Sequence, residues 1–215
     1  MTDGIKVWTT DKARSRDLSL LLPVQNAQDR LQTCLDQAGE ALKTFPGRVE
    51  ILVLDRGSTD GSAGLLARQD MTEVGNRSLR RIHLDENATE GGALRIGLSR
   101  GHGKSFAVLG GNLGGPPACL PLLLAALDGG ADLALIRVGS LIAASFACRA
   151  DPGRAVGAAS TGPDHPLSAL LKLPLRTEQI TWAPSEHPGA DGGFEGFIPF
   201  APLAWSCSSC RRRMP

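Results

Sequence analysis

The stretch VEILVLDRGSTDGS, residues 49–62, decides the fold of this chain. Its apolar run, Val49–Leu54, is typical of a strand that is buried on both faces of a parallel sheet. Asp55 ends this run, and the Gly, Ser, Thr and Asp residues of 57–62 are typical of a turn that caps a helix. A helix is expected over 63–69. The stretch therefore predicts one strand–turn–helix unit of an α/β protein.

The same alternation of apolar runs and helix-like segments continues in both directions. It predicts strands over 18–24, 79–84, 105–109 and 131–138 and helices over 29–43, 90–100 and 117–127. Strands that alternate with helices at this spacing favour an α/β fold with a mostly parallel central sheet flanked by helices. In such a sheet, ligands bind at the carboxyl ends of the strands, so a site is expected in the loops that follow them.

The chain divides into three regions by composition. We expect a polar N-terminal arm over 1–16, a domain that carries the sheet over 17–139, and an irregular, loop-rich region over 140–215. Within this last region, residues 140–150 and 167–175 are compatible with short helices.

The charge balance excludes some classes of partner. The 215 residues include 23 basic and 22 acidic side chains, which gives a formal net charge of +1, and 42% of the residues are hydrophobic. This composition indicates a globular protein with no strongly basic face for nucleic acid. We find no signal peptide and no apolar run long enough to span a bilayer, so a cytoplasmic location is expected. A membrane surface or another protein stays open as a partner.

The five cysteines do not predict a metal site. Cys34, Cys119 and Cys148 lie in apolar runs and are expected to be reduced core thiols. Cys207 and Cys210 form a CxxC pair just before Arg211–Arg213. A zinc site needs two further ligands, and neither a second CxxC nor a pair of closely spaced histidines supplies them.

Four segments resemble the motifs of one enzyme family. They are LSLLLPVQN at 18–26, VEILVLDRGSTDGS at 49–62, RRIHLDENATEGGALRIGL at 80–98 and FAVLGGNLGGPPACLPLLLAAL at 106–127. In this order and spacing they resemble the family-2-type, inverting, nucleotide-sugar glycosyltransferases, and among these the dolichyl- or polyprenyl-phosphate sugar synthases. The resemblance implies a GT-A-type fold and a UDP- or GDP-type nucleotide sugar as ligand.

The resemblance also implies a nucleotide site at the strand ends. Its residues would be Pro23, Asn26, Asp55, Arg56, Ser58 and Asp60. Asp55 can accept a hydrogen bond from a pyrimidine ring N–H, and backbone N–H groups after Gly57 can face phosphate or ribose oxygens. A plain helix-capping turn would use the same Ser, Thr and Asp residues.

The expected metal motif is degenerate. Family members bind Mg²⁺ or Mn²⁺ through an Asp-x-Asp motif, and the corresponding positions here are Gly110, Gly111 and Asn112. Such cations take carboxylate oxygens, which glycine does not offer. No Asp or Glu occurs from Gly91 through Leu127 to replace them. Arg56 also stands where the family has a second aspartate.

Three functions stay open at this level. The first is an active glycosyltransferase that transfers a hexose from a nucleoside diphosphate sugar, with Asp55, Arg56 and Asn112 in unusual roles and metal-independent catalysis as one option. The second is a pseudoenzyme that acts as a binding or regulatory module, and the third is a nucleotidyltransferase-like enzyme on the same scaffold. The resemblance implies that the region over 140–215 carries the acceptor side. The catalytic base stays unassigned among candidates in that region: Asp164, His165, Glu186, His187 and Asp191.

Overall fold

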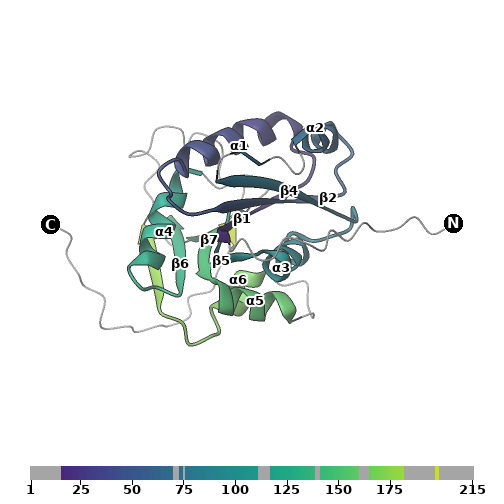
Figure 1. The fold of residues 1–215 in the computed structure, drawn as a ribbon. Helices are drawn as coiled ribbons and strands as arrows, with labels where there is room; N and C mark the ends of the chain where they lie inside the picture. Colours follow the sequence, from purple (N-terminus) through teal and green to yellow (C-terminus); the bar gives the residue numbers. More distant parts are fainter. Residues whose placement is uncertain are drawn as a thin grey trace.

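A computed structural model describes residues 16–69, 73–74, 76–110, 117–138, 141–159, 165–181 and 197–198. Within these ranges the chain forms one central sheet with helices on both faces (Figure 1). No helix in them is long and apolar enough to cross a membrane.

The sheet has nine strands within the described residues, in the order β3-β4-β2-β1-β5-β7-β6-β8, with β9 paired to β7. Their bounds are β1 Arg16–Val24, β2 Val49–Arg56, β3 Glu73–Val74, β4 Arg77–Leu84, β5 Gly103–Val108, β6 Leu133–Val138, β7 Leu141–Arg149, β8 Thr177–Thr181 and β9 Phe197–Ile198. Of these strands, β3 and β7 run against the other seven. The sheet is therefore mostly parallel, as the sequence predicts.

The helices form two layers. Their bounds are α1 Gln28–Ala41, α2 Ser62–Gln69, α3 Glu90–Arg100, η1 Pro117–Cys119, α4 Leu120–Asp128, α5 Ala150–Ala158 and α6 Pro166–Leu170. One face of the sheet packs against α1, α2 and α4, and the other against α3, α5 and α6. In Figure 1 α1 and α2 lie above β1, β2 and β4, and α3, α5 and α6 lie below the sheet.

Two apolar cores follow from this layering. Alternate residues of a strand point to opposite faces, so Leu20 and Leu22 belong to the core under α1, whereas Leu21 belongs to the core against α3. All three are fully buried. Gly97 allows the close approach of α3, because a Cβ there would lie 2.9 Å from a methyl group of Leu54. Burial on both faces explains why the strands are continuous apolar runs.

The predicted elements of the first two thirds are confirmed. Each expected strand and helix is present, with ends that differ by a few residues. The helix expected over 117–127 begins with the short η1 and continues as α4. The buried thiols are also as expected, since Cys34, Cys119 and Cys148 are free and buried.

The expectation of a helix over 140–150 is wrong. Those residues form β7, which pairs with β5 on one side and β6 on the other. The segment is rich in alanine, which favours helices, but its place between two strands decides its structure. In β7, Ser145–Cys148 are buried. The described part of the last region also carries α5, α6, β8 and β9, and the loop-rich character of 140–215 stays a prediction.

The second helix expected in that region is shorter than predicted. It covers Pro166–Leu170 instead of 167–175, and residues 177–181 then form β8 beside β6. The division of the chain at residue 139 stays a prediction, although the sheet itself continues across it through β7.

Candidate functional site

The predicted nucleotide residues lie at the carboxyl ends of β1 and β2. These strands are parallel neighbours, with Pro23 opposite Leu54 and Val24 opposite Asp55. The turns that follow them therefore meet at one edge of the sheet. Asn26 lies in the first turn, and Ser58 and Asp60 lie in the second.

Asp55 is a fully buried carboxylate at the end of β2. Its Oδ1 accepts a hydrogen bond from the backbone N–H of Ser58 at 3.0 Å, and its Oδ2 accepts one from Arg81 Nη2 at 2.6 Å. His83 Nδ1 lies 3.2 Å from the same Oδ2. Both oxygens of this carboxylate are therefore engaged within the protein.

The surroundings of Asp55 keep it ionised. Burial by itself raises the pKa of this carboxyl, but the hydrogen bonds from Ser58, Arg81 and His83 outweigh burial and hold the pKa below its usual value. The site thus presents an anionic acceptor beside a guanidinium donor at neutral pH.

Arg81 and His83 are site residues that the sequence analysis missed. They lie on β4, whose parallel register places His83 opposite Asp55 and Arg81 opposite Val53. Residues two apart on a strand share a face, so both side chains lie on the face of Asp55. The available signal was the pair of charged positions on a strand next to β2.

Side chains of the two turns hold the turns together. Asn26 Oδ1 accepts from the backbone N–H of Thr59 at 2.8 Å, and Ser58 Oγ accepts from the backbone N–H of Asn26 at 3.0 Å. Asp60 Oδ2 accepts from the backbone N–H of Gln28 at 3.0 Å, and Gln28 Oε1 accepts from Gly61 N–H at 2.7 Å. These polar groups therefore shape the edge of the site.

Two backbone positions fix the shape of these turns. Asn26 has a φ of 49°, in the left-handed region that asparagine tolerates. Gly57 has a φ of 62°, and a Cβ there would lie 2.5 Å from the Cα of Glu86. Glycine at position 57 thus lets the turn after β2 pack directly against the turn after β4.

Arg56 follows Asp55 and brings a second guanidinium to the edge. Its Nη1 donates to the carbonyl of Ala88 at 3.3 Å, while its buried Nε has no hydrogen-bond partner among the described residues. Gln25 Nε2 donates to the carbonyl of Arg56 at 3.2 Å. Arg56 therefore adds positive charge where the resemblance expects an aspartate.

The degenerate metal motif follows β5. Gly110 is buried and brings no side-chain ligand, while Gly111 and Asn112 lie outside the described residues. The part of the chain that the structure describes contains no group of three His, Cys, Asp or Glu side chains that could hold a metal ion. Gly110 thus does not fit the Mg²⁺ or Mn²⁺ that the resemblance implies.

Of the five candidate bases, the structure describes His165. This residue precedes α6, and its Nδ1 accepts from the backbone N–H of Leu167 at 3.3 Å. Its ring packs edge-on against Phe146, at 6.1 Å between centroids. Burial, together with Arg95, lowers the pKa of His165 to about 4. The other four candidates, Cys207, Cys210 and the arginines after them lie outside the described residues.

Comparison with known proteins places this geometry in a family. The model of the family described as Glycosyl transferase family 2 matches residues 19–149. This match includes β1 through β7 and the whole edge described above.

Two curated relatives are named for polyprenyl-phosphate sugars. The chain is 28% identical over 120 residues to a dodecaprenyl-phosphate galacturonate synthase from Rhizobium johnstonii, covering 56% of the chain and 35% of that protein. It is 31% identical over 118 residues to an undecaprenyl-phosphate 4-deoxy-4-formamido-L-arabinose transferase from Klebsiella pneumoniae, covering 55% of the chain and 36% of that protein. The matched part is thus about a third of each relative.

Solved structures share the fold. TarS residues 1–349 from S. aureus in complex with UDP gives a TM-score of 0.55 at 15% identity, covering 79% of this chain and 62% of that one. A second structure is glucosyl-3-phosphoglycerate synthase from Mycobacterium tuberculosis in complex with Mn²⁺, UDP and glucosyl-3-phosphoglycerate. Its TM-score is 0.54 at 16% identity, and the match covers 77% of this chain and 70% of that one. The architecture is thus that of GT-A glycosyltransferases.

Proposed function

Because the chain belongs to glycosyl transferase family 2, we propose that it binds a nucleoside diphosphate or its sugar ester at the carboxyl ends of β1 and β2, without a divalent metal and without transferring the sugar. The observation that carries the proposal is the buried, ionised Asp55 at this edge, beside Arg81 and Arg56. It is a pseudoenzyme in this proposal, a binding module built on a transferase fold.

In this proposal Asp55 binds the nucleobase of the ligand. An ionised carboxylate accepts a hydrogen bond from the ring N–H of uracil or guanine, and Arg81 beside it offers a donor for a neighbouring ring carbonyl. The hydrogen bonds that join the two turns fix these groups before the ligand arrives, which reduces the entropy lost on binding. The UDP-bound relatives of the same fold support a uridine nucleotide as the first ligand to test.

In this proposal Arg56 neutralises the negative charge of the diphosphate. A guanidinium forms strong, charge-assisted hydrogen bonds with phosphate oxygens and needs no metal to do so. The buried Nε of Arg56 has no hydrogen-bond partner among the described residues, so it can donate a hydrogen bond to a phosphate oxygen. The charge reversal at position 56 therefore supports metal-independent binding.

Transfer of the sugar is a separate requirement. The leaving diphosphate gathers negative charge as the bond to the sugar breaks, and a hard cation held by carboxylates is the usual way to stabilise it. Positions 110–112 offer one neutral side-chain oxygen, that of Asn112. This motif supports binding without turnover, and the name of either curated relative suggests a polyprenyl phosphate as the acceptor for an assay.

Titration calorimetry of the chain with UDP tests the binding step, in EDTA and again with Mn²⁺. We expect saturable binding of equal affinity in both buffers. Asp55→Asn should weaken it about tenfold or more, because a hydrogen bond to a charged group contributes about 1.5–3 kcal/mol. Asp132→Asn, which removes a carboxylate that pairs with Arg176 away from the site, is the matched control. Binding that requires Mn²⁺, or no binding in either buffer, would contradict the proposal.

A turnover assay tests the second half of the proposal. The chain is incubated with a labelled UDP-sugar, an undecaprenyl phosphate and Mn²⁺, and the lipid fraction is counted. We expect no labelled lipid and no metal-stimulated release of UDP. Labelled lipid would identify an active transferase and overturn the pseudoenzyme assignment, whatever the calorimetry gives.

A further inference from the structure

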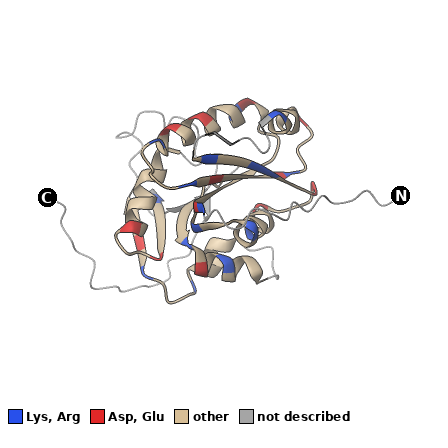
Figure 2. Ribbon diagram, viewed as in Figure 1, with Lys and Arg blue, Asp and Glu red and all other residues tan. Residues whose placement is uncertain are grey.

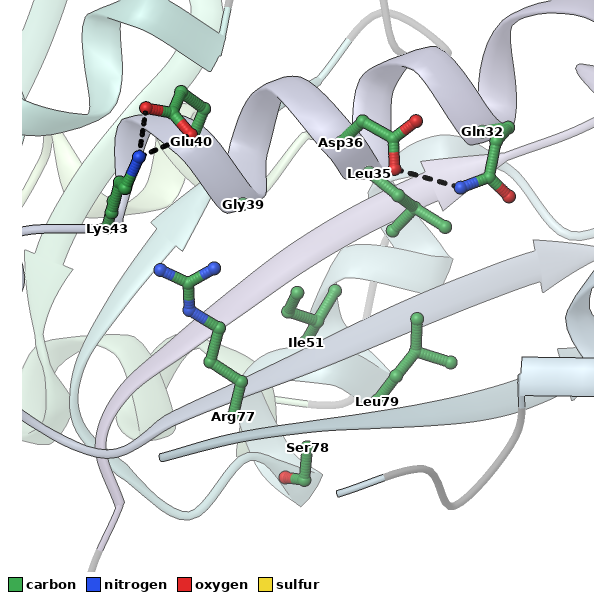
Figure 3. Close-up of a pocket in the computed structure, with 10 residues that line it drawn as sticks. All are labelled: Gln32, Leu35, Asp36, Gly39, Glu40, Lys43, Ile51, Arg77, Ser78 and Leu79. Carbon is green, nitrogen blue, oxygen red and sulfur yellow. Dashed lines mark hydrogen bonds and ion pairs between the residues drawn. The ribbon is translucent and has the colours of Figure 1, made fainter. Parts of the chain in front are cut away.

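A groove lies between α1 and the strands β2 and β4, near the amino ends of those strands (Figure 3). Its volume is about 510 Å³. Ile51 in its floor precedes Asp55 by four residues, which is roughly 13 Å along an extended strand. The groove is therefore separate from the nucleotide edge.

The floor of the groove is apolar. Leu35 from α1, Ile51 from β2 and Leu79 from β4 face one another across it, as Figure 3 shows. Its walls are polar, with Gln32, Asp36, Glu40 and Lys43 on α1 and Arg77 on β4. Figure 2 shows that the two walls differ in the sign of their charges: β4 carries Lys or Arg segments in blue, and α1 carries Asp or Glu segments in red.

Arg77 is the cation of this groove that has no ion pair among the described residues. Its side chain has no hydrogen bond or ion pair with any described residue. Lys43, the other cation, pairs with Glu40 at 3.1 Å, and Asp36 accepts a hydrogen bond from Gln32 at 2.9 Å. In Figure 3 the guanidinium of Arg77 points up toward α1, at the Lys43 end of the groove.

Gly39 leaves room for a ligand at this end. A Cβ on Gly39 would lie 3.4 Å from Arg77 Nη1, so a larger side chain would extend over the guanidinium. Glycine in the middle of a helix lowers helix stability, and here it leaves Arg77 accessible from the groove.

The size of the groove favours a small ligand over a protein. Pockets of about 300–1,000 Å³ hold drug-sized molecules, whereas a stable protein interface needs a broad surface of about 800 Å² on each side. Leu35 and Ile51 are less than a tenth exposed, so the groove offers no broad apolar face. Among the described residues, the exposed large apolar side chain is Leu122 on α4, outside this groove.

We propose that this groove binds a single-chain amphiphile that ends in a carboxylate, a molecule of the fatty-acid type. The carboxylate pairs with Arg77, and the alkyl chain lies over Leu79 and Ile51. Arg77 offers one positive charge that has no partner among the described residues, which suits a single carboxylate. A phosphate monoester carries about −1.5 to −2 at neutral pH, and that excess would face the acidic wall of Asp36 and Glu40.

The experiment is calorimetric titration of the full chain with decanoate below its micelle concentration. We expect one saturable site, with no comparable binding of decanol, which lacks the charge, or of acetate, which lacks the chain. Decyl phosphate should bind more weakly than decanoate. Saturating UDP should leave the affinity for decanoate unchanged, whether or not UDP itself binds.

Two variants locate the ligand. Arg77→Gln should weaken decanoate binding about tenfold, because it removes a charge-assisted hydrogen bond. Gly39→Leu should abolish binding while the chain stays folded, since leucine is a better helix former than glycine. Arg68→Gln on α2 is the matched control, because it removes an exposed charge outside the groove and should leave the affinity unchanged.

Several outcomes would overturn the proposal. They are equal binding of decanol and decanoate, an unchanged affinity in both variants, no saturable binding, or displacement of decanoate by UDP. The last result would place the amphiphile in the nucleotide site, and stronger binding of decyl phosphate would assign the groove to a different class of ligand.

Discussion

Arg81 is the cation that pairs with Asp55, and after Ser58 it is the next residue that holds this carboxyl ionised. Asp55 is fully buried and the side chain of Arg81 is 19% exposed, so their 2.6 Å contact is shielded from solvent. If its cation is removed, a buried carboxylate still pays the desolvation free energy of burial but loses the Coulomb attraction that offsets it. The same pair therefore contributes to stability and to the proposed base-binding group.

We predict that Arg81→Met lowers the free energy of unfolding by about 2 kcal/mol at pH 7. The folded pKa of Asp55 lies below its unfolded value, so this contribution is present above the unfolded pKa and is lost as pH falls through the folded pKa. The difference between variant and wild type should therefore shrink below about pH 4. Urea unfolding at pH 7 and pH 3 measures both values.

Arg176→Met is the control for this prediction. Arg176 also pairs with a carboxylate, that of Asp132 at 3.1 Å, but its side chain is 74% exposed. Exposed pairs contribute little, so the loss should be smaller than for Arg81→Met. Equal losses would mean that burial of Asp55 does not set the strength of its ion pair.

His165 gives the molecule a second, separate pH dependence. Its pKa falls from 6.5 to about 4 because it is buried and faces Arg95. Between these two values the unfolded chain takes up the proton and the folded chain does not, so stability falls as pH drops below 6.5. The loss should reach about 2 kcal/mol by pH 5.

His165→Asn tests this assignment. Asparagine can accept the hydrogen bond from Leu167 at the start of α6 but does not titrate. Urea unfolding at pH 7 and pH 5 should give a smaller change for the variant than for the wild type. An identical change in both proteins would remove His165 as the source.

Among the helices, α3 begins at a residue whose side chain caps it. Thr89 precedes the helix, and its Oγ1 accepts from the backbone N–H of Gly92 at 3.1 Å. The turn before α3 also receives Arg56 through the carbonyl of Ala88.

We predict that Thr89→Ala lowers the free energy of unfolding by about 1 kcal/mol, because it removes the side-chain cap. Thr89→Ser keeps the hydroxyl and should stay close to the wild type. Urea denaturation midpoints measure both. A serine variant as unstable as the alanine variant would show that the methyl group of Thr89, not its hydroxyl, matters.

For the whole molecule, the sheet joins the parts of the chain that composition separates. β7 pairs with both β5 and β6, and α5 and α6 cover the face that α3 shares. Phe146, Val156 and Leu167, all from beyond residue 139, belong to that core. The first two thirds therefore depend on the last third to complete one of their two cores.

We predict that a fragment of residues 17–139 does not unfold cooperatively, because it exposes the edges of β5 and β6 and lacks about a third of the buried residues of one core. Thermal unfolding followed by circular dichroism measures this. The matched control is residues 17–181, which keeps β7, α5, α6 and β8. A sharp transition in the short fragment would show that residues 17–139 form a domain on their own.

Local sequence signals predict the edge of the candidate site but not all of the contacts found there. Asp55, Ser58 and Asp60 follow a strand and carry turn residues, which are local signals. Arg81 lies 26 positions from Asp55, and its role depends on the register of β4 against β2. Register is set by packing across the sheet, so reading one segment at a time does not find such a partner.

The sequence by itself determined local features: the apolar runs of the strands and the caps and turns between them. From these features follows an α/β sheet whose loops carry Asp55 and the degenerate positions 110–112. The tertiary structure decided what pairs with what. It placed Arg81 on Asp55, made 141–149 a strand, and left Arg77 without an ion pair to any described residue, in a groove beside α1. The physical reason is that periodicity and turn propensity act within a few residues, whereas strand pairing, burial and charge compensation depend on segments that meet only when the chain folds.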